Sequence, residues 1–394
     1  MNIGLFTDTY YPQVSGVATS IKTLREQLER QGHNVYIFTT TDPNVNKSVY
    51  ERNIFRFTSI PFVSFTDRRI AVRGLFQAYQ VAKKLELDIV HTQTEFSMGL
   101  IGKFVAKSLK IPCVHTYHTM YEDYLHYVAK GKLLKPTHVK VMTRTYCENM
   151  SGIIAPSTRV LDKLTAYEVK EPIKIISTGV DVTKFQQKEI KNYRKKYNLD
   201  ENTPLILTLS RLAFEKDIDR LINSLPAIKD KIPNVKMMIC GDGPARESLE
   251  QQVREMGLVS DVIFTGEIKN DEVPHYYHMA DVFVSASVSE SQGLTYIEAL
   301  AAGLKIVTTH SPYTDELLDN PSLGITFDTP KEYVDSVVMY LIDGDSYQDV
   351  ELRKKKLSES SAAIFGERIV AFYHSSQEYY LRKNGETSHS SEIG

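Results

Sequence analysis

Short apolar runs rich in β-branched residues alternate along this chain with longer stretches of helical periodicity. Ten of the short runs predict strands: NIGLFT, NVYIFTT, DIVHT, PCVHTY and GIIAPS in the first half, then PLILTLS, VKMMICG, VIFTG, DVFVSAS and KIVTT in the second. Between them, stretches such as 17–30 and 294–302 have the apolar spacing of amphipathic helices. Strands that alternate with helices in this way predict an α/β fold with parallel sheets and crossover helices.

The number of these runs and the length of the chain, 394 residues, both indicate two domains. We expect two doubly wound, Rossmann-like domains in 1–175 and 176–365 that face a central cleft. A C-terminal helix in 366–394 is expected to return to the first domain before the chain frays. In such sheets ligands bind beyond the carboxyl ends of the strands, where the strand order reverses.

The net charge of −2 conceals a gradient along the chain. Residues 1–174 carry 23 Lys and Arg against 15 Asp and Glu, a net charge of +8, and the remainder therefore has −10. The first domain is predicted to be cationic and to favour an anionic partner.

The cysteines and the N-terminal segment indicate the cellular compartment of the protein. Cys113, Cys147 and Cys240 lie in apolar runs without metal-type spacing, so we expect reduced core residues in a cytosolic protein. The N-terminal segment has no basic residue before Lys22 and does not resemble a signal peptide. No stretch reaches the roughly 18 apolar residues of a membrane span. Any membrane contact is therefore expected at the surface.

Candidate phosphate ligands follow predicted strands in both halves. Gly16 precedes a helix start, where backbone N–H groups attract phosphate, although ordinary turn chemistry is the simpler explanation. Arg211 and Lys216 follow the strand PLILTLS and suit a diphosphate; a solvated pair that caps a helix is an equal alternative. Gly241, in the turn CGDGP, is interpreted first as a turn residue and second as a ligand contact.

The segment SVSESQGLTYIEALAAG is the most specific feature of the sequence. Glu290 lies in the loop after DVFVSAS, Gly293 opens a helix, and Glu298 lies inside that helix. A carboxylate one turn into a helix can accept two hydrogen bonds from a ribose diol. The loop carboxylate and the free N–H groups of the helix would then face a sugar and a phosphate.

Together these motifs resemble the retaining family 4 glycosyltransferases of GT-B architecture. The resemblance rests on SRLAFEKD and on the E-x7-E pattern of Glu290 and Glu298, and TDTYYPQVSGV, PCVHTYH and STGVD extend it over nearly the whole chain. Within the family, the sequence is most similar to the bacterial diacylglycerol α-glucosyltransferases, which are monotopic enzymes. The resemblance implies transfer of a hexose, with glucose preferred, from a UDP-sugar to 1,2-diacylglycerol. The reaction would take place at the inner face of the cytoplasmic membrane.

The resemblance also implies the residues of the site. Those implied to bind the donor are Gly16, Arg211, Lys216, Gly241, Glu290, Gln292, Gly293, Leu294 and Glu298. Arg211 and Lys216 would bind the diphosphate, and Glu298 the ribose. Glu290 would contact the transferred sugar, which His118 meets from the other domain. The implied catalytic residues are His118, Glu290, Arg211 and Lys216.

The family reaction is usually described as a same-face displacement, in which the departing phosphate oxygen accepts the proton of the acceptor hydroxyl. Arg and Lys donors would stabilise the charge on that leaving group, so we expect neither a cofactor nor a metal ion. The Asp-x-Asp triplets at 217–219 and 343–345 lie in helix-start or turn contexts and are not expected to bind Mg²⁺ or Mn²⁺.

Histidines near the end of PCVHTYH need separate interpretations. A histidine within a buried strand is more often a satisfied core group, which is our interpretation of His115. His118 follows the point where the strand leaves the sheet, and this position favours a functional role.

Basic and aromatic residues of the first half form a candidate membrane surface. The stretch 66–87 is predicted to be an amphipathic helix, and 120–144 interleaves tyrosines with lysines. The candidate membrane residues are Arg69, Arg73, Lys84, Tyr124, Lys130, Lys132, Lys135 and Lys140. Packing helices with solvated lysines are the alternative, and the net charge of the domain favours an anionic membrane. No recognition motif supports nucleic acid as the partner.

Two other functions stay open from the sequence. The same fold can act on a soluble acceptor or a polysaccharide, or it can bind a nucleotide sugar without catalysis. The intact set of Arg211, Lys216, Glu290 and Glu298 argues against the non-catalytic alternative.

Overall fold

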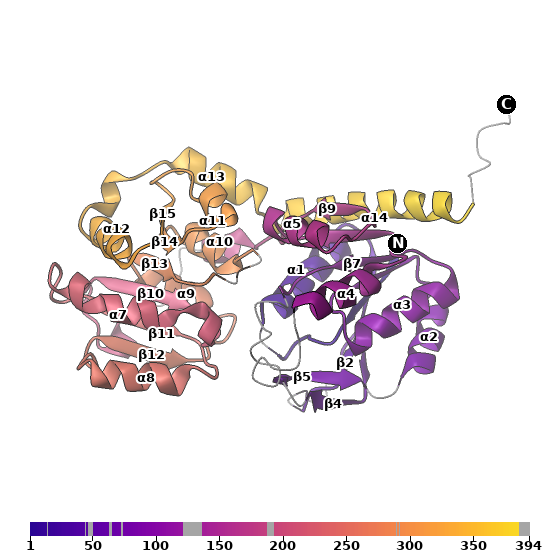
Figure 1. Cartoon of the computed structure of the whole chain (residues 1–394), viewed down its shortest axis with the longest axis horizontal. Coiled ribbons are helices and arrows are strands. Elements are labelled where there is room, and N and C mark those ends of the chain that lie inside the picture. The colour runs from indigo at the N-terminus through magenta and orange to yellow at the C-terminus, as the bar shows by residue number, and fades with distance from the viewer. Residues whose placement is uncertain are drawn as a thin grey trace. The chain divides into compact units, whose positions relative to one another are not determined.

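The computed structural model divides the chain into two compact units, each with its own parallel sheet (Figure 1). The first unit contains Met1–Gly179 and Ala362–Gly394, and the second contains Val180–Ser361. The structure describes residues 1–13, 15–43, 45, 50–62, 65–71, 74–120, 136–186, 193–288, 290 and 292–385, with the backbone alone at 61–62 and 65–70.

The sheet of the first unit has seven strands in the order β3-β2-β1-β6-β7-β8-β9, all parallel. Its strands are β1 (Asn2–Thr7), β2 (Asn34–Thr40), β3 (Ile54–Phe57), β6 (Ile89–Thr92), β7 (Cys113–Thr116), β8 (Gly152–Ala155) and β9 (Ile173–Ile175). Its helices are α1 (Gly16–Arg30), α2 (Leu75–Lys84), α3 (Ser97–Leu109), α4 (Pro136–Cys147), α5 (Thr158–Ala166) and α14 (Ala362–Lys383). The chain builds outward from β1 to β3 and then returns to β6 on the other side of β1. The switch point therefore lies between β1 and β6.

Both faces of this sheet are covered because alternate side chains of each strand point to opposite sides. Ile3 and Leu5 pack in a cluster with α1 and α14, whereas Phe6 packs with α2 and α3 and stacks on Phe38 at 4.3 Å between ring centroids. The C-terminal helix contributes Phe365, Ile369, Phe372 and Tyr373 to the first of these clusters. Thus the last helix of the chain completes the core of the first unit.

The second sheet has six parallel strands in the order β12-β11-β10-β13-β14-β15. Its strands are β10 (Leu205–Leu209), β11 (Lys236–Cys240), β12 (Val262–Gly266), β13 (Val282–Ser285), β14 (Lys305–Thr309) and β15 (Gly324–Phe327). Its helices are α6 (Val182–Phe185), α7 (Ile218–Lys229), α8 (Arg246–Glu255), α9 (Val273–Met279), α10 (Leu294–Ala301), α11 (Pro312–Leu317), α12 (Pro330–Asp343) and α13 (Val350–Glu359). The switch point of this sheet lies between β10 and β13.

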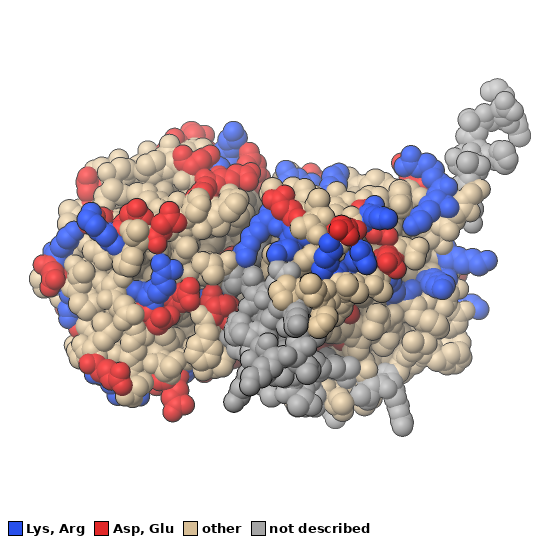
Figure 2. Space-filling view, viewed as in Figure 1, with Lys and Arg blue, Asp and Glu red and all other residues tan. Residues whose placement is uncertain are grey.

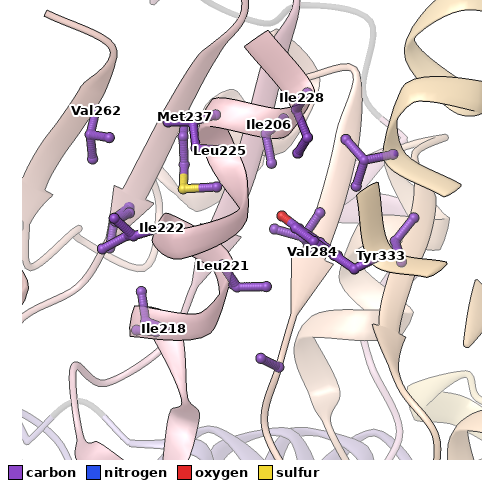
Figure 3. Packing of buried hydrophobic residues seen from close by; sticks show 14 of the residues in the cluster. Ile206, Ile218, Leu221, Ile222, Leu225, Ile228, Met237, Val262, Val284 and Tyr333 are labelled. Carbon is purple, nitrogen blue, oxygen red and sulfur yellow. The ribbon is translucent and has the colours of Figure 1, made fainter. Parts of the chain in front are cut away.

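Helix α7 illustrates how the apolar periodicity is used. Ile218, Leu221, Ile222 and Leu225 recur at the spacing of one helical face. Figure 3 shows this face against strand residues of the second sheet, which include Ile206, Met237, Val262 and Val284. The buried face fixes the start of α7, and with it the loop that precedes the helix.

The predicted α/β fold with parallel sheets is confirmed, and all ten predicted strands are present. The helix predicted over 66–87 is wrong in its first part. Residues 65–71 form β5 (Phe65–Ala71), which pairs antiparallel with β4 (Ser59–Phe62), and the helix α2 begins only at Leu75. Gly74 separates the two elements at φ 126°, and a Cβ there would lie 2.5 Å from the Phe57 ring. A helix cannot continue through that conformation.

Candidate active site

The loop after β10 carries the two candidate phosphate ligands of the second unit, Arg211 and Lys216. Its backbone is hydrogen-bonded to the turn after β11: Leu212 N donates to Asp242 O at 2.9 Å, and Ala245 N donates to Leu212 O at 2.9 Å. Gly241 permits this approach because a Cβ there would lie 1.9 Å from Ser210 O. The structure thus gives Gly241 a structural reason to be glycine: it keeps the loop that carries Arg211 in place.

Lys216 meets Glu290 at the switch point of the second sheet. Its Nζ lies 2.6 Å from Glu290 Oε1 and 3.4 Å from Ser287 Oγ, and the two side chains are 13% and 26% exposed. The partners come from the loops after β10 and β13, which are neighbouring strands. The site therefore holds one fixed cation and one fixed carboxylate at a place where sheets of this kind bind ligands.

Helix α10 begins immediately after this carboxylate. Gly293 is its N-cap at φ 67°, and a Cβ there would lie 2.5 Å from the Tyr296 ring. Gln292 is buried, and Leu294 is the first helical residue. The first N–H groups of a helix have no partner inside the helix, and they attract negative charge.

Glu298 lies one turn further along α10. Tyr277 donates its hydroxyl to Glu298 Oε2 at 2.9 Å. Burial raises the pKa of Glu298 to about 7, against the opposing effects of the Tyr277 hydrogen bond and the Lys184 charge. A carboxyl group with this pKa is poised between its protonated and ionised forms at neutral pH.

In the first unit, Gly16 is the first residue of α1. Ser15 caps this helix by accepting from Ala18 N at 3.1 Å. Gly16 is exposed, and no atom of the described residues lies within 4 Å of the position a Cβ would occupy. The structure leaves room beside Gly16, which is the geometry that the implied phosphate contact needs.

His118 follows β7 of the first sheet and is only partly buried. Its Nε2 donates to Gln93 Oε1 at 2.7 Å. Burial, and to a lesser extent the neighbouring His115, lower the pKa of His118 to about 3. The ring is therefore neutral at physiological pH, and it can exchange hydrogen bonds with a sugar without carrying charge.

His115 lies in the core, within the polar network beside His118. Its Nδ1 donates to Thr92 O at 3.0 Å, and its Nε2 lies 3.1 Å from Glu95 Oε1. Both ring nitrogens are engaged inside the protein, as is typical of a buried structural histidine.

Most of the candidate membrane residues lie outside the described part of the chain. These are Arg73, Tyr124, Lys130, Lys132 and Lys135, together with the side chain of Arg69. Lys84 is exposed at the end of α2. Lys140 of α4 pairs with Glu168 at 2.8 Å, so it also has a role within the unit.

Three residues near these sites were not singled out by the sequence patterns. Gln93 holds His118, Tyr277 holds Glu298, and Asp8 joins the end of β1 to α3. Asp8 also precedes the loop to Gly16. A polar residue directly after an apolar strand was the one available signal for Gln93 and Asp8.

Comparison with known proteins decides the family. A model of glycosyltransferase family 4 matches residues 14–184, and a model of the group 1 glycosyl transferases matches 189–357. The alpha-monoglucosyldiacylglycerol synthase of Streptococcus pneumoniae is 44% identical over 379 residues, which cover 95% of this chain and 85% of that protein. This chain is a family 4 glycosyltransferase. The synthase of the same name from Acholeplasma laidlawii is 34% identical to the glycosyltransferase, over 86% of this chain and 87% of its own.

Solved structures support the fold of this glycosyltransferase. Anabaena HepE in complex with UDP and glucose superposes with a TM-score of 0.77 at 17% identity, over 95% of this chain and all of that one. Sucrose-phosphate synthase from Thermosynechococcus elongatus gives a TM-score of 0.77 at 20% identity, over 95% of this chain and 98% of that one. At these identities the likeness concerns the fold.

Proposed function

We propose that this glycosyltransferase moves a hexose, with glucose preferred, from a UDP-sugar to 1,2-diacylglycerol with retention of configuration. The observation that carries the proposal is the 44% identity, over 95% of the chain, to a relative named for this product. The Lys216–Glu290 pair and Glu298, grouped at the switch point of the second sheet, support a nucleotide-sugar donor.

The proposed step is a same-face displacement. The bond between the anomeric carbon and the diphosphate oxygen breaks, and the acceptor hydroxyl oxygen bonds to that carbon. The hydroxyl proton passes to the departing phosphate oxygen. Arg211, Lys216 and the N-terminus of α10 would stabilise the charge on the diphosphate, so the proposal includes no metal ion.

The direct test is product formation. The protein is incubated with diacylglycerol micelles and each of several UDP-hexoses, and the lipid phase is analysed by mass spectrometry. We expect monohexosyl-diacylglycerol from UDP-glucose. Transfer to a soluble acceptor with none to lipid would contradict the proposal.

Replacing His118 by alanine should lower kcat by about a hundredfold, because the sugar loses a positioning contact. UDP binding and the melting temperature should stay close to wild type, since UDP is proposed to bind the second unit. Calorimetric titration with UDP and steady-state kinetics separate the two effects. Wild-type turnover in His118→Ala would remove this residue from the site.

UDP binding should depend on the protonation of Glu298. With a pKa of about 7, this carboxyl group is mostly protonated at pH 6 and mostly ionised at pH 8. The ionised form accepts both ribose hydroxyls, so affinity should rise about tenfold over this range. UDP phosphate ionisation contributes equally in a Glu298→Gln control, so the difference between the two proteins isolates Glu298. The same pH dependence in both would contradict the ribose assignment.

The membrane contact belongs to the same proposal, at the inner face of the cell membrane. None of the helices in the described part of the chain combines the length and apolar character needed to cross a bilayer. Helices α2, α3 and α4 nevertheless expose large apolar side chains: Leu75, Phe76, Leu100, Phe104, Val141 and Met142. Exposed lysines accompany them at Lys83, Lys84 and Lys107. Aliphatic and aromatic side chains among cations suit an anionic lipid surface.

These three helices are neighbours in the first unit. α2 and α3 pack against each other, and Lys103 of α3 donates to Glu148 O, just after α4, at 3.1 Å. Figure 2 shows Lys and Arg side chains over the part of the surface where Figure 1 draws α3 and α4.

Replacing Phe76 and Phe104 together by serine should weaken binding to phosphatidylglycerol vesicles by about tenfold or more at low salt, because two buried aromatic contacts with the lipid are lost. Phe76 is 70% exposed and Phe104 is 40% exposed, so the two substitutions should leave the fold intact. Ile342→Ser, at an equally exposed position in the second unit, is the matched control and should bind as wild type. Co-sedimentation with the vesicles measures the binding of the wild type and of each variant. Equal binding of all three proteins would contradict the assignment of this surface to the membrane.

A further inference from the structure

Gln93 occupies the switch point of the first sheet. It directly follows β6, next to β1, and its N–H donates to Phe6 O at 2.8 Å. Its side chain is only 2% exposed. A buried amide at this place in a doubly wound sheet stands where such folds bind their ligands.

The oxygen of the Gln93 side-chain amide has a hydrogen-bond partner, whereas the nitrogen has none among the described residues. Its Oε1 accepts from His118 Nε2 at 2.7 Å. Its Nε2 is buried, and no atom of the described residues accepts a hydrogen bond from it. A buried donor without an acceptor is costly in a folded protein, and such groups are rare outside functional sites.

The orientation of this pair fixes the state of the imidazole. Because an amide oxygen only accepts, His118 Nε2 must carry the proton. In the neutral ring Nδ1 then has a lone pair that can accept from a hydroxyl group. The ring thus presents an acceptor, while the amide beside it presents a donor.

We propose that Gln93 is a positioning residue for His118 and a second contact for the same substrate. It holds His118 in the Nε2–H tautomer, so that Nδ1 accepts from a hydroxyl of the hexose or the glycerol. Its own Nε2 donates to a neighbouring oxygen of that ligand. This assignment rests on the proposed function, in which His118 contacts the substrate.

Two histidines of the neighbouring strands, His91 and His115, are already engaged. His115 of β7 uses Thr92 and faces the Glu95 carboxylate, and His91 of β6 lies 2.7 Å from both Tyr373 Oη and Thr116 Oγ1. Burial, with His115 and His118 as lesser causes, also lowers the pKa of His91 well below its usual value. Neither histidine therefore accepts a hydrogen bond from the Gln93 Nε2, which has no acceptor among the described residues.

The tautomer can be measured without any substrate. Nitrogen-15 NMR of histidine-labelled protein, assigned with His118→Ala, reports which ring nitrogen carries the proton. We expect the Nε2–H form in the wild type and a mixture of both tautomers in Gln93→Met. A His118 ring with the proton on Nδ1 in the wild type, or an unchanged spectrum in the variant, would overturn the assignment.

Steady-state kinetics test whether Gln93 and His118 act together on the substrate. Gln93→Met should lower kcat by about a hundredfold while UDP affinity stays within about twofold. The double variant with His118→Ala should be no slower than His118→Ala alone within about threefold, because coupled residues are not additive. The matched control is Gln27→Met, a buried glutamine of α1, which should keep wild-type kcat. Additive losses, or unchanged turnover in Gln93→Met, would overturn the inference.

Gln93→Glu should change the pH profile of kcat/KM, which would stay unchanged if Gln93 had only a structural role. The carboxylate still accepts from Nε2, but its charge raises the pKa of His118. The pH profile of kcat/KM should therefore gain an acidic limb, with activity lost as pH falls through the raised pKa. An unshifted profile would count against the inference. If the wild type forms no hexosyl-diacylglycerol, the proposed function fails, whereas the NMR experiment still decides the pairing of Gln93 with His118.

Discussion

Replacing Lys216 by methionine should lower kcat/KM for hexose transfer by about a thousandfold. The Nζ of Lys216 is fixed 2.6 Å from Glu290 Oε1, and the proposed function assigns this cation to the leaving diphosphate. The variant loses that cation and also leaves the Glu290 carboxylate without its partner. The remaining charge repels the phosphates, so both donor affinity and kcat should fall.

Steady-state kinetics in mixed micelles, together with calorimetric titration of UDP, measure the two contributions. Lys231→Met is the matched control, because Lys231 also pairs with a carboxylate in the second unit, Asp335 at 3.0 Å. That pair is on the surface, and its loss should change turnover by less than about twofold. Activity of Lys216→Met within threefold of wild type would exclude Lys216 from the donor site.

Asp8→Ala should destabilise the first unit by about 3 to 5 kcal/mol. The Asp8 carboxylate is buried at the end of β1. It accepts from Thr94 Oγ1 at 2.6 Å, from Ser97 Oγ and from Met98 N at 3.0 Å, which is at the start of α3. Alanine leaves all three donors unsatisfied and releases the strand end that leads to Gly16.

Urea denaturation of the full chain should show this as an early transition of the first unit. Asp88→Ala serves as the control, because Asp88 also accepts a backbone hydrogen bond, from Asn2 N at 2.7 Å, but at an exposed position. It should cost less than about 1 kcal/mol. If the two variants unfold at the same urea concentration, the Asp8 network does not hold the switch point together.

The sequence predicted the central strands of both sheets and the edge strand β12, and it missed the edge strands β3, β9 and β15. Runs such as PLILTLS and KIVTT are apolar throughout because helices cover both sides of the central strands. β9 is partly exposed at a sheet edge, so its segment carries no continuous apolar run. The helix predicted over 66–87 was wrong in its first part for another reason. The apolar positions of this stretch fit a helix, but Gly74 has a positive φ that a helix cannot accommodate.

The prediction of the candidate site depended more on the resemblance to a known family than on the spacing of residues in the sequence. No pattern in the sequence relates Lys216 to Glu290, which lie 74 positions apart and meet only because β10 and β13 are neighbours. The only signal for Gln93 was its position directly after an apolar strand, and a single glutamine at such a position is too common to single it out. Its importance comes from a missing partner, which only the folded arrangement of β6 and His118 reveals.

Helix α14 has a consequence for how this protein is made. Its residues Phe365, Ile369 and Tyr373 fill the core of the first unit, and Tyr373 Oη lies 2.7 Å from His91 Nδ1. Domains commonly fold in order as they leave the ribosome. Here the core of the first unit is complete only after the last helix has been synthesised, whereas the whole of the second unit precedes that helix. A nascent chain stopped at Ser361 would carry an uncovered apolar face, open to chaperones and to proteases.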